Sequence, residues 1–222
     1  MAAIDEDGEL NALGPPVVEE RVDRSAHRAA GEEDVVAEDD RPPREVEVEV
    51  RGVDDGLRAG LAVREIVEKT DGSGLAVVGI HRRGALLAQR VRDLVAELVG
   101  EPIPLGDIDI SFYRDDVATR KSQPTVHASH IEFPIEGITV VLVDDVLYTG
   151  RTARAAIDAL FDYGRPARVQ LAVVADRGHR ELPIRPDYVG KNLPTAASER
   201  VFVRVEELDG VDEVVISERV AA

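Results

Sequence analysis

The feature that most constrains the fold of this chain is the stretch VVLVDDVLYTGRT, residues 140–152. Its four leading apolar residues, with Ile138 just before them, are typical of a strand buried on both faces. Asp144 and Asp145 come directly after that strand. A loop of small residues follows, and apolar side chains then recur at helical spacing. The order of strand, acidic pair, loop and helix predicts an α/β fold.

The loop within this stretch has the chemistry of a sugar-phosphate site. A helix N-terminus presents unpaired N–H groups and the positive end of the helix dipole, which together bind a phosphate without any lysine. Gly150 allows a close backbone approach, and the hydroxyls of Thr149 and Thr152 add donors. Asp144 and Asp145 suit two ribose hydroxyls or a hydrated Mg²⁺. The alternative is that this pair only ends a strand and caps a helix, but the full pattern favours a phosphorylated sugar.

The acidic composition restricts the partners of the chain. Its 222 residues include 27 basic and 44 acidic side chains, which gives a net charge of −17. This charge opposes non-specific binding to nucleic acid, because such binding requires clustered Lys and Arg. The sequence has no cysteine, no apolar run of membrane-spanning length and no secretory signal at its start. We therefore expect a cytoplasmic protein without disulfides.

The chain is expected to divide into a tail and one domain. Residues 1–44 combine acidic clusters and two Pro-Pro pairs without any period that could bury a face, which predicts a disordered tail. The strict alternation of EVEVEV predicts an edge strand over 45–50, where a domain over 45–222 begins. A helix is expected over about 54–69. Two short alternating strands near the C-terminus are expected to complete the sheet.

A second unit of strand, loop and helix is predicted over 75–100. His81, Arg82 and Arg83 lie in its loop, just before the helix. Two arginines and a histidine beside a helix N-terminus suit an anion that carries several negative charges. A basic surface turn is the alternative interpretation of the same residues.

Two irregular segments are predicted to cover the ends of the strands. A strand over 107–113 leads into a long polar connection over about 114–136, which is typical of a functional lid, or alternatively of a surface hairpin. The segment over about 176–200 concentrates basic residues and prolines in an otherwise acidic chain. Such a segment can form a hood over a planar nucleobase.

The run VVLVDD with TGRT resembles the phosphoribosyl pyrophosphate (PRPP) signature of type I phosphoribosyltransferases. The longer strings DDVLYTGRT, DRGHRELPIR and YVGKN resemble the PyrR family, known for pyrimidine-operon regulation and uracil phosphoribosyltransferase activity. The resemblance covers roughly residues 45–220. It implies the type I phosphoribosyltransferase fold, with a central, mostly parallel sheet flanked by helices, a small hood and a flexible lid loop. It also implies that uracil and PRPP react to give UMP and pyrophosphate, with Mg²⁺ as cofactor.

The same resemblance implies roles for individual residues. The catalytic residues would be Asp144, Asp145 and Arg114, and the two aspartates would hold Mg²⁺ indirectly, through PRPP and water. PRPP would be bound by Arg82, Arg83, Asp144, Asp145, Val146, Leu147, Tyr148, Thr149, Gly150, Arg151 and Thr152. The base would be bound by Asp176, Arg177 and Val189. Tyr148 stands where purine-type members usually carry an acidic residue, and this favours a pyrimidine.

The regulatory role implied by the family is UMP-dependent binding to the leader of a pyrimidine-operon mRNA. Its candidate RNA contacts are Arg64, His179, Arg180, Arg185 and Lys191. The chain departs from the RNA-binding pattern of the family at Gly60, Leu61 and Arg82. Three functions therefore stay open: a uracil phosphoribosyltransferase, an RNA-binding regulator with little catalysis, and a phosphoribosyltransferase for another nucleobase. We expect a homo-oligomer that does not bind membranes.

Overall fold

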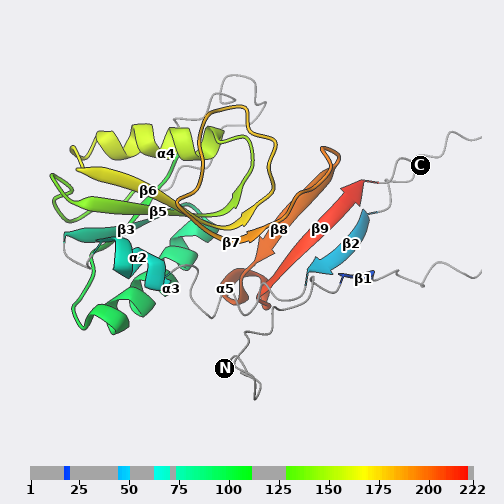
Figure 1. Cartoon of the computed structure of the whole chain (residues 1–222), viewed down its shortest axis with the longest axis horizontal. Helices are drawn as coiled ribbons and strands as arrows, with labels where there is room; N and C mark the ends of the chain where they lie inside the picture. The colour runs from blue at the N-terminus through cyan, green and yellow to red at the C-terminus, as the bar shows by residue number, and fades with distance from the viewer. Residues whose placement is uncertain (1–17, 21–44, 51–62, 71–73, 112–128, 220–222) are drawn as a thin grey trace, which may run out of the picture.

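A five-stranded parallel sheet forms the centre of the molecule (Figure 1). The computed structural model describes residues 18–20, 45–50, 63–70, 74–111 and 129–219. The strand order is β4-β3-β5-β6-β7. The strands are β3 (Leu75–Ile80), β4 (Leu105–Ile108), β5 (Thr139–Leu147), β6 (Arg168–Asp176) and β7 (Tyr188–Asn192). The predicted α/β class with a mostly parallel sheet is confirmed.

Helices cover both faces of this sheet (Figure 1). The helices α2 (Val63–Thr70) and α3 (Arg83–Val99) pack on one face, where Val141 and Val143 of β5 are fully buried. The helix α4 (Arg151–Phe161) packs on the other face against Val140 and Leu142. Successive residues of β5 thus point into different cores, which explains why the strand is apolar throughout. Alanines at four positions of α4 allow it to lie close to the sheet.

A second, antiparallel sheet lies beside the first one (Figure 1). Its order is β1-β2-β9-β8, and its strands are β1 (Val18–Glu20), β2 (Glu45–Val50), β8 (Glu199–Arg204) and β9 (Glu213–Arg219). The expected edge strand over 45–50 is therefore an inner strand, and the C-terminal strands do not join the central sheet as expected. The inward valines Val201, Val203 and Val214 belong to the same core as α3, and this joins the two sheets.

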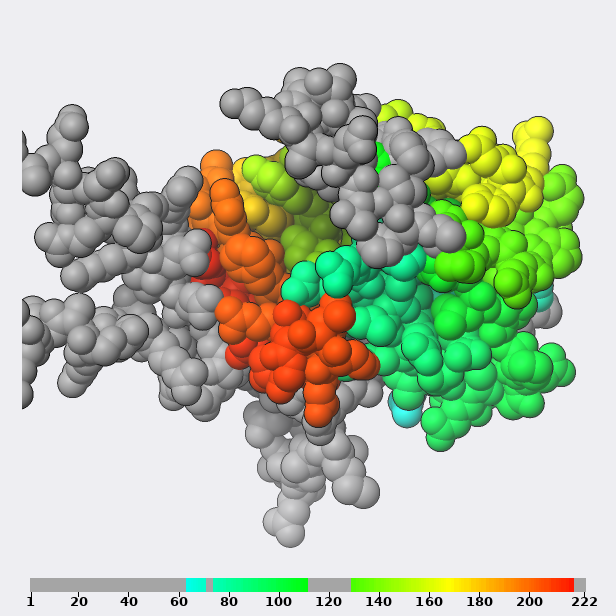
Figure 2. Space-filling view, turned by 180° about the vertical axis from the view of Figure 1, so that it is seen from behind, coloured from blue at the N-terminus to red at the C-terminus, as the bar shows by residue number. Residues whose placement is uncertain are grey.

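The connection between β8 and β9 is attached to α3 by ion pairs. It contains the short helix α5 (Glu206–Asp209). The guanidinium of Arg90 donates to Glu207 at 2.6 Å and to Asp212 at 2.9 Å, and it lowers the pKa of Glu207. Arg83, two helical turns earlier, donates to Asp209 at 2.9 Å. In Figure 2 the orange-red surface of this connection lies directly against the blue-green surface of α3.

Several expected boundaries differ from the observed ones. The described part of the strand expected over 107–113 belongs to β4, Leu105–Ile108, and β4 ends there because Asp109 accepts a hydrogen bond from the N–H of Ser111 and turns the chain. Residues 112 and 113 lie outside the described residues. The described part of the helix expected over 54–69 is α2, and residues 51–62, with Gly60 and Leu61, lie outside the described residues. The tail over 1–44 stays a prediction, since only β1 is described there. None of the described helices is long and apolar enough to cross a membrane.

Candidate active site

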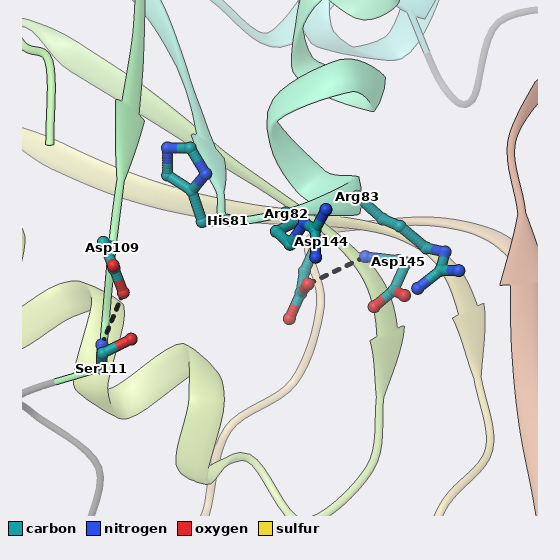
Figure 3. Close-up of a pocket in the computed structure, with 7 residues that line it drawn as sticks. All are labelled: His81, Arg82, Arg83, Asp109, Ser111, Asp144 and Asp145. Carbon is teal, nitrogen blue, oxygen red and sulfur yellow. Dashed lines mark hydrogen bonds between the residues drawn. The ribbon is translucent and has the colours of Figure 1, made fainter. Parts of the chain in front are cut away.

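A cavity of about 410 Å³ opens at the carboxyl edge of the central sheet (Figure 3). Parallel α/β sheets commonly place their ligands at this edge. Three strand ends and one helix start supply its walls, and both signs of charge are present. The lining residues are His81, Arg82, Arg83, Asp109, Ser111, Asp144 and Asp145.

The acidic pair belongs to β5 and does not follow it. The sequence places Asp144 and Asp145 after the strand, but β5 continues to Leu147 because it stays paired with β6 as far as Asp176. Its pairing with β3 ends earlier, at Val143. At the acidic pair β5 is therefore bonded to β6 alone. On the side where β3 has ended, both carboxylate side chains line the cavity.

Asp144 is the buried member of the pair. Its side chain accepts the N–H of Asp145 at 2.9 Å, and the residue is only 8% exposed. Burial, and then the charge of Asp145, raise the pKa of Asp144 well above its usual range. The carboxylate of Asp145 accepts the N–H of Val146 at 2.7 Å and is less buried. The two neighbouring carboxyls thus stand in different environments, as is common at catalytic sites.

The basic wall of the cavity is the start of α3. The helix begins at Arg83, and Arg82 just before it is exposed. The His81–Arg82 peptide bond is cis. Arg83 reaches both the cavity and Asp209 of α5. These residues lie opposite the acidic pair because α3 packs tightly on β5 at Gly84, where a Cβ would lie 2.5 Å from the carbonyl oxygen of Val143.

The predicted phosphate loop joins β5 to α4. Gly150 precedes the helix with a φ of 91°, a left-handed conformation that disfavours other residues. The carbonyl of Thr149 accepts the N–H groups of Glu181 and Leu182, and the Arg151 side chain donates to Glu181 at 2.7 Å. The loop is therefore held in place by the chain that follows β6. Of the other residues expected to bind PRPP there, Leu147 is buried in the core, so only its backbone could contact a ligand.

The region where the base is expected to bind contains an aromatic ring that is held by a guanidinium group. Tyr148 is 37% exposed, and the guanidinium of Arg177 lies over its ring at 4.1 Å. Arg177 is itself buried and donates to Thr195, Ala196 and Glu199. Arg177 thus links the ring of Tyr148 to the segment after β7. Val189 lies in β7 and packs against the core beside α4.

The candidate RNA-binding residues differ in how many hydrogen bonds their side chains make within the protein. The guanidinium of Arg180 donates to the carbonyls of Leu147, Tyr148, Gly178 and Ile184, and pairs with Asp176 at 2.5 Å. The ring of His179 bonds to the carbonyl of Thr195 at 2.6 Å. Arg64 and Arg185 are exposed and Lys191 is half-buried. Arg114 lies outside the described residues. These assignments stay predictions, and for Arg180 an RNA contact would require internal bonds to break.

Sequence reasoning missed two residues of the cavity, Asp109 and Ser111. Asp109 is buried and accepts the N–H of Ser111 at 2.7 Å, while its own N–H donates to Ser129. A pattern that could have indicated this wall is the alternation of Asp107 and Asp109 with isoleucines. That spacing places both carboxylates on one side of the chain, close to the end of β4.

Comparison with known proteins identifies the relatives of this chain. A model of the phosphoribosyl transferase domain matches residues 53–209. The bifunctional protein PyrR of Pelotomaculum thermopropionicum is 53% identical over 167 residues, 74% of this chain and 92% of that protein. The PyrR of Thermus thermophilus is 57% identical over 159 residues, 71% of this chain and 88% of that protein. The chain belongs to the PyrR family.

The fold of this PyrR-family chain is shared with more distant phosphoribosyltransferases. A crystal structure of the hypoxanthine phosphoribosyltransferase of Trypanosoma cruzi superposes with a TM-score of 0.55 at 18% identity. The match covers 76% of this chain and 93% of the other. At this identity the likeness concerns the fold alone, and it confirms the type I phosphoribosyltransferase architecture.

Proposed function

We propose that this PyrR-family chain is a uracil phosphoribosyltransferase, which converts uracil and PRPP to UMP and pyrophosphate. The observation that carries the proposal is the cavity that joins Asp144 and Asp145 of β5 to the basic start of α3, where β5 leads through the loop of Thr149–Thr152 into α4. A ribose with a phosphate at one end and a pyrophosphate at the other needs a site of this kind. The alternatives, another base or a regulator with little catalysis, are outcomes of the test below.

The reaction exchanges two bonds at C1′ of the ribose. The bond from C1′ to N1 of uracil forms as the bond from C1′ to the pyrophosphate oxygen breaks. The electron pair of the broken bond stays on pyrophosphate, and the proton of N1 is released. Positive charge develops on the ribose meanwhile, and the carboxylates of Asp144 and Asp145 stabilise it and hold the ribose hydroxyls. The backbone N–H groups at the start of α4 bind the 5′-phosphate.

The acidic pair fits Mg²⁺, the cofactor expected for this chemistry. Among the described residues no group of three or more His, Cys, Asp or Glu side chains is placed to hold a metal directly. Mg²⁺ at phosphate sites is usually bound by one or two carboxylates, waters and substrate oxygens, and Asp144 and Asp145 can supply those carboxylates. When bound, Mg²⁺ neutralises charge on the leaving pyrophosphate. The arginines at the start of α3 bind the same group and orient it.

Tyr148 supports the choice of a pyrimidine. Tyr148 directly follows β5, and the guanidinium of Arg177 lies over its ring. Part of its surface is exposed in the region where the base is expected to bind. An aromatic ring there offers a planar surface and no carboxylate to accept a proton from a purine nitrogen. A small planar base fits this environment, and uracil is the base that the PyrR resemblance implies.

A panel of nucleobases tests the proposed function. Purified protein with PRPP and Mg²⁺ should form nucleotide with uracil at least about 100-fold faster than with hypoxanthine, guanine or adenine, since buried polar groups left unpaired reject wrong bases strongly. Product is measured by chromatography. The same assay with Mg²⁺ removed by chelation should lose activity. A faster reaction with a purine would replace the uracil assignment, and no product with any base would overturn the enzymatic proposal.

A second function, UMP-dependent binding to a pyrimidine-operon mRNA leader, is favoured by the bifunctional relatives. Exposed Arg64 and Arg185 are the described candidates that a phosphate could reach without breaking internal bonds. Filter binding at several salt concentrations should show UMP strengthening the complex, and Arg185→Gln weakening it about tenfold. Equal weak binding to unrelated RNA, with or without UMP, would argue against this function.

A further inference from the structure

Two basic side chains contact the ring of Tyr148, in the region where the base is expected to bind. The guanidinium of Arg177 lies over this ring at 4.1 Å from its centre, and the residue is only 6% exposed. The ring of His179 meets the tyrosine ring at an angle of 68°, with 6.0 Å between the ring centres. The position of the tyrosine ring therefore depends on how Arg177 and His179 are held.

Both of these side chains are hydrogen-bonded to one residue, Thr195, which follows β7. The hydroxyl of Thr195 accepts the Nε hydrogen of Arg177 at 3.1 Å, and it donates to the carbonyl of the same arginine at 3.5 Å. The carbonyl of Thr195 accepts a hydrogen from Nε2 of His179 at 2.6 Å. One threonine thus fixes both of the basic residues that contact Tyr148.

The turn that begins at Thr195 is itself held by hydrogen bonds. The N–H of Ala196 donates to the carboxylate of Glu199 at 2.6 Å, and the N–H of Glu199 donates to the carbonyl of Ala196 at 3.2 Å. The carbonyls of these two residues accept Nη2 of Arg177 at 3.2 and 2.6 Å. Since β8 begins at Glu199, the turn also connects the second sheet to this part of the site. A guanidinium held in this way has little freedom to move.

The backbone at His179 is strained. Its φ of 57° lies in the left-handed region, which residues other than glycine rarely adopt, and it directly follows Gly178 with a φ of 79°. Strain of this kind persists where surrounding contacts hold it, and it is common at functional sites. The bond from the ring of His179 to the carbonyl of Thr195 is such a contact.

We propose that Thr195 is a positioning residue, which holds Arg177 over the ring of Tyr148 and so fixes the wall against which the base binds. The inference rests on the proposed function and deepens it, because it concerns the recognition of the base. The ribose and its 5′-phosphate are bound by other parts of the chain, the end of β5 and the start of α4. Base binding can therefore be weakened while binding of the sugar phosphate is kept.

Thr195→Val is the variant that tests this role. Valine keeps the size and shape of the side chain, but it leaves Nε of the buried Arg177 without an acceptor, so the guanidinium must shift. We expect the affinity for UMP to fall about tenfold, as when a buried charged group loses a hydrogen-bond partner. The affinity for ribose 5-phosphate, which lacks the base, should change less than about twofold. In the enzyme assay the KM for uracil should rise about tenfold, with the KM for PRPP unchanged.

Three further variants serve as controls. Thr195→Ser keeps the hydroxyl and should bind UMP within about twofold of the wild type. Adding Thr195→Val to Tyr148→Leu should weaken UMP binding no further, because Thr195 acts through that ring. Thr139→Val makes the same change at the first residue of β5, away from the carboxyl end of the strand, and should leave both affinities unchanged.

Calorimetry on the full chain with UMP and with ribose 5-phosphate separates this inference from the proposed enzyme. If the wild type forms no UMP from uracil and PRPP, the proposed function fails, while a selective loss of UMP affinity in Thr195→Val still supports the inference. Equal losses for both ligands, unchanged UMP binding, no rescue by serine, a further loss in the double variant, or a wild type that binds UMP no better than ribose 5-phosphate would each overturn it. If Thr195→Val does not fold, Thr195→Ala compared with Thr195→Ser decides by the same measurement.

Discussion

Replacing Asp144 by asparagine will abolish most of the activity and at the same time stabilise the ligand-free protein. The carboxylate of Asp144 is buried beside the charge of Asp145, and its pKa is raised well above the usual range. Asparagine keeps the oxygen that accepts the N–H of Asp145 but needs no charge in that position. Activity should fall at least about 100-fold, as when a group that stabilises transition-state charge is removed.

The gain in stability should depend on pH. A carboxyl whose pKa is higher in the folded than in the unfolded protein favours folding below the unfolded pKa, and that advantage is lost as pH rises through the folded pKa. The variant has no such group. At pH 8 its Tm should exceed that of the wild type by roughly 2–4 °C, which corresponds to about 1 kcal/mol in the free energy of unfolding. At pH 4 the difference should be smaller.

Calorimetry in buffer with a chelator measures this effect without Mg²⁺. The matched control is Asp145→Asn, which changes the neighbouring and more exposed carboxylate. It should also lose activity, since the proposed ribose contact needs both groups, but it should raise the Tm less. A lower Tm for Asp144→Asn across the whole pH range would show that the charge of Asp144 stabilises the fold.

The sequence predicts most of the central sheet because its strands are apolar on both faces. β3 and the first half of β5 are found at the expected residues. The unit predicted over 75–100 ends as expected at Gly100, whose N–H donates to the carbonyl of Ala96. The end of β5 was misplaced for a physical reason. Asp144 and Asp145 are still part of the strand, and they are polar because they line a cavity. In the sequence, polar residues after an apolar run look like the end of the strand.

Contacts between distant residues could not be predicted in this way. His81 and Asp107 are 26 residues apart, and Arg83 and Asp209 are 126 apart. Periodicity indicates which face of an element is buried, but not which charged side chains meet when elements pack. The same holds for Arg177 and Arg180, whose guanidinium groups bind carbonyls of the surrounding loops. Their roles as ligand contacts, which the family resemblance implies, stay predictions.

Replacing Gly84 by alanine will disrupt both the fold and the site. A Cβ at this position would lie 2.5 Å from the carbonyl oxygen of Val143 and 3.3 Å from the Cα of Asp144. Backbone atoms cannot rotate away as a side chain would, so α3 must move off β5. Overpacking of this kind destabilises by on the order of 3 kcal/mol, which exceeds the gain of about 1 kcal/mol in helix propensity. The Tm should fall by roughly 6–12 °C.

The displacement should also separate the two walls of the cavity. Arg82 and Arg83 lie at the start of α3, and the acidic pair lies on β5, so any gap opened at Gly84 moves one set of charges away from the other. PRPP binding needs both sets, and we expect its KM to rise by more than about tenfold, since a small misplacement of binding groups is costly. Thermal unfolding and kinetics on the same sample measure both effects.

Gly137→Ala is the matched control for this substitution. Gly137 has a φ of 73° and no heavy atom within 4 Å of its Cβ position, so alanine there meets only the left-handed backbone preference, about 1–2 kcal/mol. It lies outside the cavity lining and should leave the KM for PRPP unchanged. If Gly84→Ala were no less stable than Gly137→Ala and bound PRPP normally, the close packing of α3 on β5 could not be what brings the basic wall to the acidic pair.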